Sequence, residues 1–143
     1  MVYKKLLRKR CKEKINSLSG DEIYTKSKVI VDKIKNSSEF KKAKNVLIYK
    51  SFGNEVDLSE LEKEDKVFSY PVCLSENKMK AVVPLDGFYL NEYGILEPNG
   101  IETNDIDLVI CPMLGFDSNL YRIGYGKGYY DRFLEKIDCP VIG

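Results

Sequence analysis

The sequence predicts an α/β domain. Helix-like and strand-like segments alternate along the chain, which is the order typical of this class. Residues 105–112 (DIDLVICP) hold a continuous apolar stretch bounded by turn signals, as expected of a strand buried on both faces of a sheet. With 143 residues, 43% of them hydrophobic, the chain is long enough for one core and too short for two. We therefore expect a single soluble domain over residues 1–143.

Two helices are expected before residue 36. Apolar side chains recur at helical spacing between residues 3 and 18 and predict one face of an amphipathic helix: Leu7, Cys11, Ile15 and Leu18. Ser19 and Glu22 have the spacing of a capping box, which predicts the start of a second helix. This second helix should run towards Lys35 and bury three isoleucines: Ile23, Ile30 and Ile34.

Short strands and loops are expected in the middle of the chain. Three segments have the composition of strands: 45–50, 66–72 and 78–85. The loop after the first of them carries Glu55, and a short helix is expected around Leu58 and Leu61. Residues 89–100 (YLNEYGILEPNG) contain glycine and proline and predict a turn-rich connection.

A glycine-rich turn follows the buried strand. Residues 121–133 (YRIGYGKGYYDRF) place three of the chain's ten glycines within five residues. After Gly128, apolar residues at helical spacing predict a helix with one face towards the core: Tyr130, Phe133, Leu134 and Ile137. Residues 139–143 (CPVIG) have the composition of a further strand.

The composition narrows the chemistry. The chain has no histidine, which excludes a Ser–His or Cys–His dyad and any histidine-ligated metal. Phosphoryl transfer, which relies on positioning, charge neutralisation and magnesium, is therefore favoured. Four widely spaced cysteines without a CxxC pair disfavour zinc and a disulfide framework, and they are typical of a reducing cytoplasm. A net charge of +1 and the lack of a long apolar run predict no general attraction to nucleic acid and no membrane span.

The glycine-rich turn can be interpreted in two ways. Its backbone amides could bind a phosphate, with Lys127 balancing the charge and Asp131 giving magnesium an oxygen ligand. Tyr129 would then line the site. Alternatively, the glycines only permit tight turns and Asp131 complements the helix dipole. The spacing matches neither a Walker A loop nor a GxGxxG fingerprint, so it does not decide between the two.

Other polar residues also have two interpretations. Lys4 and Arg8 are one helical turn apart and could grip a polyphosphate together, or they form a solvated basic face. Glu55 could accept hydrogen bonds from a polar heterocycle, or it is an unpaired surface acid. The cysteines are more typical of small core residues than of nucleophiles.

Five segments, taken together and in order, resemble the 5-formyltetrahydrofolate cyclo-ligases, also called methenyltetrahydrofolate synthetases: KKLLR, NEVD, YGILEP, DLVICPMLGFD and YRIGYGKGYYDRFL. The resemblance covers nearly the whole chain. It implies a three-layer α/β fold with a central, mostly parallel sheet, akin to sugar-phosphate isomerases and CoA transferases. It also implies ATP- and Mg²⁺-dependent conversion of 5-formyltetrahydrofolate to 5,10-methenyltetrahydrofolate, ADP and phosphate, without a protein nucleophile.

The same resemblance implies the site residues. Those for ATP are Lys4, Lys5, Leu6, Leu7, Arg8, Arg122, Ile123, Gly124, Tyr125, Gly126, Lys127, Gly128, Tyr129 and Tyr130. Those for folate are Lys50, Glu55, Tyr125, Gly126, Lys127, Gly128 and Tyr129, of which Glu55 would bind the pterin. Asp131 falls on the family's magnesium aspartate, and Arg122 and Lys127 are the candidate catalytic cations. Small molecules are the expected partners, with no nucleic acid and no membrane.

The chain departs from the family pattern in places. Lys50 is an unusual residue for its pocket position. Leu120 stands where the family usually has glycine, so the turn there is expected to be reshaped. The segment between Glu55 and Val67 is shorter than usual, which should trim a helix. The family continues beyond the equivalent of residue 143, with a second aspartate near the metal.

Three other functions stay open. One is a truncated relative that binds nucleotide or folate without turnover, because the further segment would help to close the site. Another is a paralogue that acts on a different formylated or thiamine-related compound. Nucleic-acid binding by the basic first helix is disfavoured, because acidic residues elsewhere balance its charge.

Overall fold

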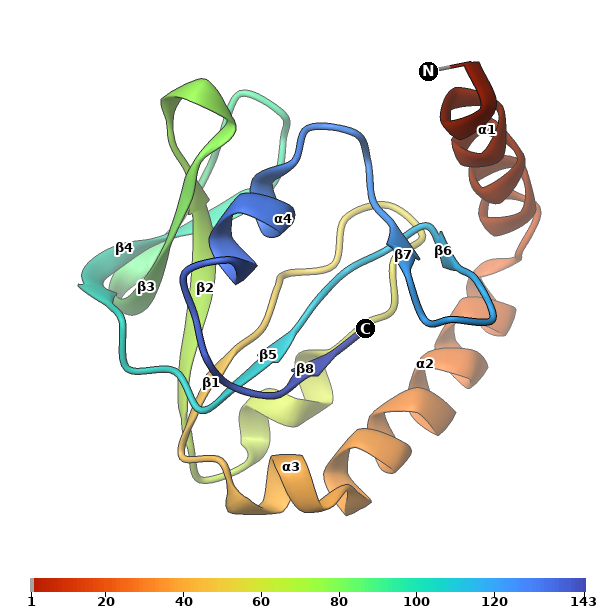
Figure 1. Ribbon diagram of the computed structural model, residues 1–143. Coiled ribbons are helices and arrows are strands. Elements are labelled where there is room, and N and C mark those ends of the chain that lie inside the picture. Colours follow the sequence, from red (N-terminus) through yellow and green to blue (C-terminus); the bar gives the residue numbers. More distant parts are fainter. Residues whose placement is uncertain (1) are drawn as a thin grey trace.

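A six-stranded sheet with the order β4-β3-β2-β1-β5-β8 forms the centre of the computed structural model, which describes residues 2–143 (Figure 1). Its strands are β1 (Asn45–Leu47), β2 (Val67–Cys73), β3 (Met79–Leu90), β4 (Leu96–Thr103), β5 (Leu108–Ile110) and β8 (Val141–Ile142). The three pairs β1–β2, β1–β5 and β5–β8 are parallel, whereas β2–β3 and β3–β4 are antiparallel. The α/β prediction is confirmed, with a mixed, mostly parallel sheet. The expected kinship with sugar-phosphate isomerases and CoA transferases stays a prediction.

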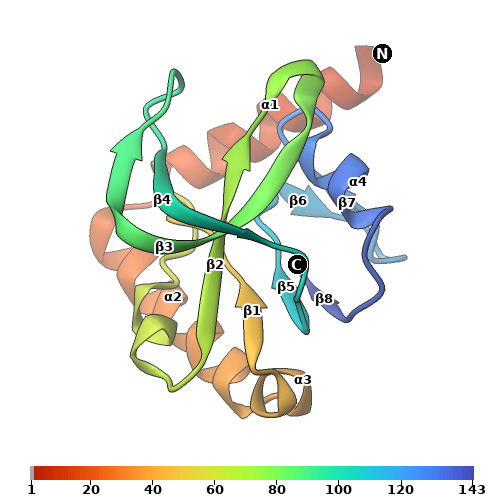
Figure 2. The ribbon, with the colours of Figure 1, turned by 90° about the vertical axis from the view of Figure 1, so that its left-hand side faces the viewer.

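Helices cover both faces of this sheet, as Figure 2 shows from the side. The helical segments are α1 (Val2–Asn16), α2 (Gly20–Asn36), α3 (Ser38–Lys42), the 3₁₀ segments η1 (Ser59–Lys63) and η2 (Ser75–Asn77), and α4 (Tyr129–Leu134). The capping box is confirmed, because the Ser19 hydroxyl accepts from the Glu22 amide and the Glu22 carboxylate accepts from the Ser19 amide. None of the helices described in residues 2–143 is long and apolar enough to cross a membrane.

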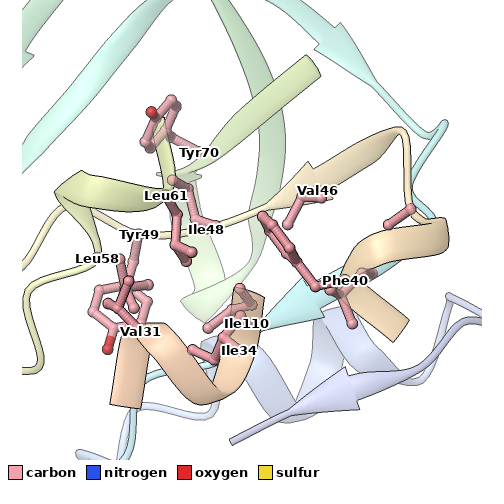
Figure 3. Packing of buried hydrophobic residues seen from close by; sticks show 12 residues of the cluster. Val31, Ile34, Phe40, Val46, Ile48, Tyr49, Leu58, Leu61, Tyr70 and Ile110 are labelled. Atoms are coloured by element: carbon pink, nitrogen blue, oxygen red, sulfur yellow. The ribbon is translucent and has the colours of Figure 1, made fainter. Parts of the chain in front are cut away.

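The central strands send alternate side chains into two cores. Val46 and Ile48 belong to a cluster that also contains Ile34 of α2, Phe40 of α3 and Leu61 of η1 (Figure 3). On the other face, Leu47, Val109 and Cys111 of the sheet and the segment after it pack with Phe133 of α4. A strand buried on both faces requires such a continuous apolar run. The prediction for residues 105–112 is thereby confirmed.

The buried face of α2 differs from the prediction in part. Ile34 is buried as expected, but its buried companions are Ser27 and Val31, whereas Ile30 is 37% exposed and Ile23 is partly buried. Helical spacing identifies an apolar stripe but not the element that covers it. In this protein the stripe around Ile23 and Ile30 faces a pocket instead of the sheet.

Of residues 89–100, for which the sequence predicted a turn-rich connection, only 91–95 form a turn, and the others lie in strands. β3 continues through a register shift between Pro84 and Phe88, and the turn at residues 91–95 leads into β4. Pro98 and a glycine are tolerated because β4 is the edge strand of the sheet. The buried carboxylate of Glu97 joins the hairpin, as it accepts from the Cys73 amide, the Tyr89 hydroxyl and the Asn91 amide group.

A second, two-stranded sheet was not predicted. Its strands are β6 (Gly115–Phe116) and β7 (Arg122–Ile123), an antiparallel pair that lies between the main sheet and α1 (Figure 1). The chain therefore returns through a hairpin before it reaches the glycine-rich turn. Strands of two residues carry too little periodicity to be recognised in a sequence.

Leu120 has the backbone conformation that glycine favours. The expected reshaping of its turn relative to the family stays a prediction. The φ of Leu120 is 64°, in the left-handed region, and its side chain is 80% exposed. A non-glycine residue in the left-handed conformation destabilises the folded state by about 1–2 kcal/mol. Glycine avoids this cost, but it loses more conformational entropy on folding, which costs about 0.5–1 kcal/mol.

We expect Leu120→Gly to stabilise the fold by up to about 1 kcal/mol and to raise the melting temperature by a few degrees. Leu120→Ala removes the same side chain but keeps the backbone cost, so it should leave the melting temperature near that of the parent. Equal melting temperatures for the glycine and alanine variants would contradict the proposed strain.

Candidate active site

The candidate site lies at the boundary between β1 and β5, from which the connections to the next strands lead in opposite directions. The chain passes from β1 to β2 through η1 on one face, and from β5 to β8 through α4 on the other. In open α/β sheets, the crevice beyond the carboxyl ends of two such strands is the usual ligand site. Glu55 lies in the loop after β1, and the glycine-rich turn lies between β7 and α4. The topology therefore brings the loop with Glu55 and the glycine-rich turn together at the carboxyl ends of the central strands.

Glu55 and Tyr125 are in direct contact across 70 residues of sequence. The Tyr125 hydroxyl donates to Glu55 Oε2 at 2.9 Å, and the Phe52 amide donates to Oε1 at 2.7 Å. Burial raises the pKa of Glu55, although these two hydrogen bonds oppose the rise. Tyr125, itself desolvated and next to this carboxylate, also has a raised pKa. The carboxylate of Glu55 is thus fixed by two hydrogen bonds, which excludes the alternative of an unpaired surface acid.

A pocket of about 420 Å³ contains this pair. Its walls come from α1, α2, the loop around Phe52 and the segment after β5: Lys12, Ile15, Asn16, Leu18, Ile23, Lys26, Ser27, Ile30, Phe52, Gly53, Asn54, Glu55, Val56, Met113, Leu114 and Tyr125. Half of these residues are apolar, and the others include two lysines, two asparagines, Ser27 and Glu55. This is the usual character of a small-molecule site.

Arg8 of α1 lies against the glycine-rich turn. Its Nε donates to the Gly124 carbonyl at 3.1 Å. A Cβ added to Gly126 would stand 3.3 Å from the Arg8 Cζ and 3.4 Å from its Nε. Gly126 also has a φ of 97°, which side chains rarely permit. The backbone conformation therefore favours glycine at this position, and a side chain there would also have to shift the guanidinium by a few tenths of an ångström.

The turn presents unused backbone donors. Within residues 2–143, the amides of residues 124–128 donate to no acceptor of the protein. The turn is anchored instead by its carbonyls, since the Lys127 carbonyl accepts from Arg132 at 3.5 Å in addition to the bond from Arg8. Lys127 and Tyr125 are exposed there. Free amides next to basic side chains are suited to an anion.

Arg122 and Asp131 form an ion pair beside the turn. Arg122 Nη2 donates to Asp131 Oδ1 at 2.7 Å, and the Arg122 side chain is 16% exposed, against 77% for Asp131. The guanidinium also lies 5.8 Å from the centre of the Tyr130 ring. The pair leaves the second carboxylate oxygen of Asp131 free. Asp131 can therefore offer one oxygen to a cation.

The fit to magnesium depends on this donor set. In the part of the chain that the structure describes, no group of three or more acidic or cysteine side chains could hold a metal by itself. Magnesium, however, is commonly held by one or two carboxylates together with substrate phosphates. The single free oxygen of Asp131 suits that arrangement and does not suit a metal site made of protein ligands alone.

The two tyrosines that begin α4 have different surroundings. The Tyr129 hydroxyl lies 3.4 Å from that of Tyr93 in the β3–β4 turn, and the Tyr129 side chain is partly buried against the core that contains Phe133. Its role in lining the site stays a prediction. Tyr130 packs in the core against the sheet, and among the described residues its buried hydroxyl has no partner. Burial raises the pKa of Tyr130. The contact of Tyr93 with Tyr129 was not predicted, although its segment YGILEP had already been singled out.

Lys50 lies away from the Glu55 pocket. Its Nζ pairs with Glu62 at 3.0 Å and stands over the rings of Tyr70 and Phe88, at 5.2 and 4.7 Å. These contacts hold the ammonium against η1, β2 and β3. Its role in binding folate stays a prediction.

The remaining predicted residues lie on α1 or carry thiols. Lys4, Lys5 and Leu6 are exposed on the helix that also holds Arg8, and no residue of α1 is buried. Burial raises the pKa of Cys73 and of Cys111 to about 11, so both thiols stay neutral near pH 7. Neutral thiols are poor nucleophiles.

Comparisons with known proteins show the family to which the chain is similar. The model of the 5-formyltetrahydrofolate cyclo-ligase family matches residues 1–142. The 5-formyltetrahydrofolate cyclo-ligase of Mus musculus is 26% identical over 93% of this chain and 74% of its own length. A probable one from Schizosaccharomyces pombe is 29% identical over 94% of this chain and 73% of its own length.

Solved structures show the same likeness. The 5,10-methenyltetrahydrofolate synthetase of Aquifex aeolicus has a TM-score of 0.82 and 30% identity, with 98% of this chain and 81% of that chain covered. The one from Mycoplasma pneumoniae has a TM-score of 0.73 and 28% identity, over 94% of this chain and 78% of that chain. The chain belongs to the 5-formyltetrahydrofolate cyclo-ligase family.

Proposed function

We propose that this chain converts 5-formyltetrahydrofolate to 5,10-methenyltetrahydrofolate, with ATP converted to ADP and phosphate. Its family consists of ATP-dependent ligases of folate one-carbon metabolism. The observation that carries the proposal is that one turn contacts both predicted binding segments. Gly124 bonds to Arg8 of α1, and Tyr125, the next residue, bonds to Glu55.

The nucleotide is assigned to the Arg8 side of this turn. The free amides of residues 124–128 would bind the phosphates, with the guanidinium of Arg8 against them and Lys4 one helical turn away. Lys127 and Arg122 would offset the charge that develops on the transferred phosphoryl group. This assignment accounts for the need for glycine at position 126.

The folate is assigned to the Glu55 side of the turn. A pterin presents neighbouring N–H donors on one edge, and a carboxylate matches such donors with its two oxygens. Glu55 is positioned for this by its bonds to Phe52 and Tyr125. The apolar walls of the pocket then suit the flat rings of the ligand.

The reaction needs no protein nucleophile. The formyl oxygen attacks the γ-phosphorus, so an O–P bond forms and ADP leaves. N10 then attacks the activated carbon and loses its proton, and phosphate departs with the former formyl oxygen. Magnesium, held by ATP and by the free oxygen of Asp131, would neutralise phosphate charge. The protein contributes placement and cations, in agreement with a chain that lacks histidine.

Isotope transfer tests this reaction directly. With ¹⁸O in the formyl group of the substrate, we expect one labelled oxygen in each phosphate that is released. Mass spectrometry of the phosphate measures the transfer. Unlabelled phosphate accompanied by methenyl product would contradict phosphorylation of the formyl oxygen, and ATP-dependent turnover of a different formylated compound would favour the paralogue alternative.

A further inference from the structure

The pocket that contains Glu55 has a side that none of the assigned residues occupies. α2 contributes Ile23, Lys26 and Ile30 to it at helical spacing, and α1 contributes Lys12 and Ile15. These two helices therefore present an apolar surface with one lysine on each. The isoleucines that the sequence predicted for the core are left free to contact a ligand.

The lysines at this pocket are available for an anion. Among the residues that the structure describes, neither Lys12 nor Lys26 lies within 4.0 Å of a carboxylate oxygen. Glu22, one turn before Lys26, is the nearest competitor along α2, and its carboxylate is bonded to the Ser19 amide. The one carboxylate that lines the pocket, Glu55, is bonded to Tyr125 and Phe52. The pocket thus contains two lysines without an ion-pair partner among the described residues, and a carboxylate that is already hydrogen-bonded.

We propose that Lys12 and Lys26 bind the carboxylates of the glutamate tail of folate. The inference rests on the proposed function, because it assigns the rest of the molecule whose pterin is assigned to Glu55. The aminobenzoyl ring would lie against Ile23 and Ile30. An elongated ligand with donors on one edge, an aromatic middle and an anionic tail matches a pocket with a carboxylate, an apolar wall and two lysines.

Kinetics with and without the tail tests the proposal. The substrates are 5-formyltetrahydrofolate and 5-formyltetrahydropteroate, which lacks glutamate. Exposed ion pairs are typically worth up to about 1 kcal/mol, and 1.4 kcal/mol is tenfold. We therefore expect Lys12→Ala and Lys26→Ala each to raise the KM for 5-formyltetrahydrofolate about threefold, and the double variant about tenfold, with kcat unchanged.

Three controls make the test specific. The KM for 5-formyltetrahydropteroate should not change in any variant. Lys9→Ala and Lys33→Ala remove one exposed lysine each from the same two helices, outside the pocket, and should behave as the parent. The difference between the two substrates should also shrink as salt is added, because exposed charges are screened.

The outcomes separate the proposal from the proposed function. Equal KM changes for both substrates, or none for either, would overturn the role of the lysines while cyclo-ligase activity stands. If the parent turns over neither substrate, the proposed function fails, and equilibrium binding of the two compounds then decides on the tail site. Equal affinity for the two compounds in that binding measurement would overturn the assignment of Lys12 and Lys26 to the glutamate tail.

Discussion

Gly126→Ala should lower kcat/KM for ATP at least tenfold while the chain stays folded. Gly126 has a φ of 97°, and an added Cβ would stand 3.3 Å from the Arg8 Cζ. The new methyl group must therefore strain the turn or displace the guanidinium from the Gly124 carbonyl. The first change would disturb the amides, and the second the guanidinium, that we propose to bind the phosphates, and a small displacement in a phosphoryl-transfer site is costly.

Three further variants locate the cause of this loss. Gly20→Ala is the matched control, because Gly20 has open space around its Cα and no left-handed φ. If the loss acts through Arg8, then Arg8→Ala and Gly126→Ala should be clearly less than additive in the double variant. Full additivity would show that Gly126 and Arg8 act independently. Steady-state kinetics with ATP as the varied substrate gives all four values.

Glu55→Gln should raise the KM for folate at least tenfold and leave the melting temperature unchanged or higher. Burial disfavours the ionised carboxylate, which is why the pKa of Glu55 is raised. Glutamine keeps the shape and an acceptor for the Phe52 amide but cannot match the pterin donors with two oxygens. Function should be lost without loss of stability. Glu64→Gln, at an exposed position, is the control.

The same pKa sets the direction of two pH effects. A raised pKa in the folded state means that the contribution of Glu55 to stability is fully present below its unfolded pKa. That contribution is lost as the pH rises through the folded value. Folate affinity should change in the opposite direction, weakening as the pH falls through the same value. If Glu55→Gln has the folate affinity and the pH profile of the parent, Glu55 is not part of the folate-binding site.

Local signals in the sequence were sufficient for much of the fold. Ser19 and Glu22 marked the start of α2, and the apolar run before Cys111 identified the doubly buried β5. β4 was missed because Pro98 and Gly100 are signals of a turn, and only its place at the sheet edge makes them acceptable in a strand.

The segments that form the candidate site could be predicted from the sequence, but the contacts between them could not. The glycine-rich turn and Glu55 were identified from residue type and resemblance. That Arg8 would bond to Gly124, 116 residues away, depends on the packing of α1 beside the β6–β7 hairpin, which no local pattern encodes. The lining of the pocket by Ile23 and Ile30 has the same origin, since periodicity gives a helix face without naming its neighbour.

The most direct measurement of the central claim is the absorbance of the conjugated methenyl product when the 143-residue chain is mixed with Mg-ATP and 5-formyltetrahydrofolate. We predict ATP-dependent product formation with one ADP and one phosphate released per product, and none without ATP. Tight binding of both ligands with no product, in the presence of Mg-ATP, would contradict the account and favour the binding-only relative.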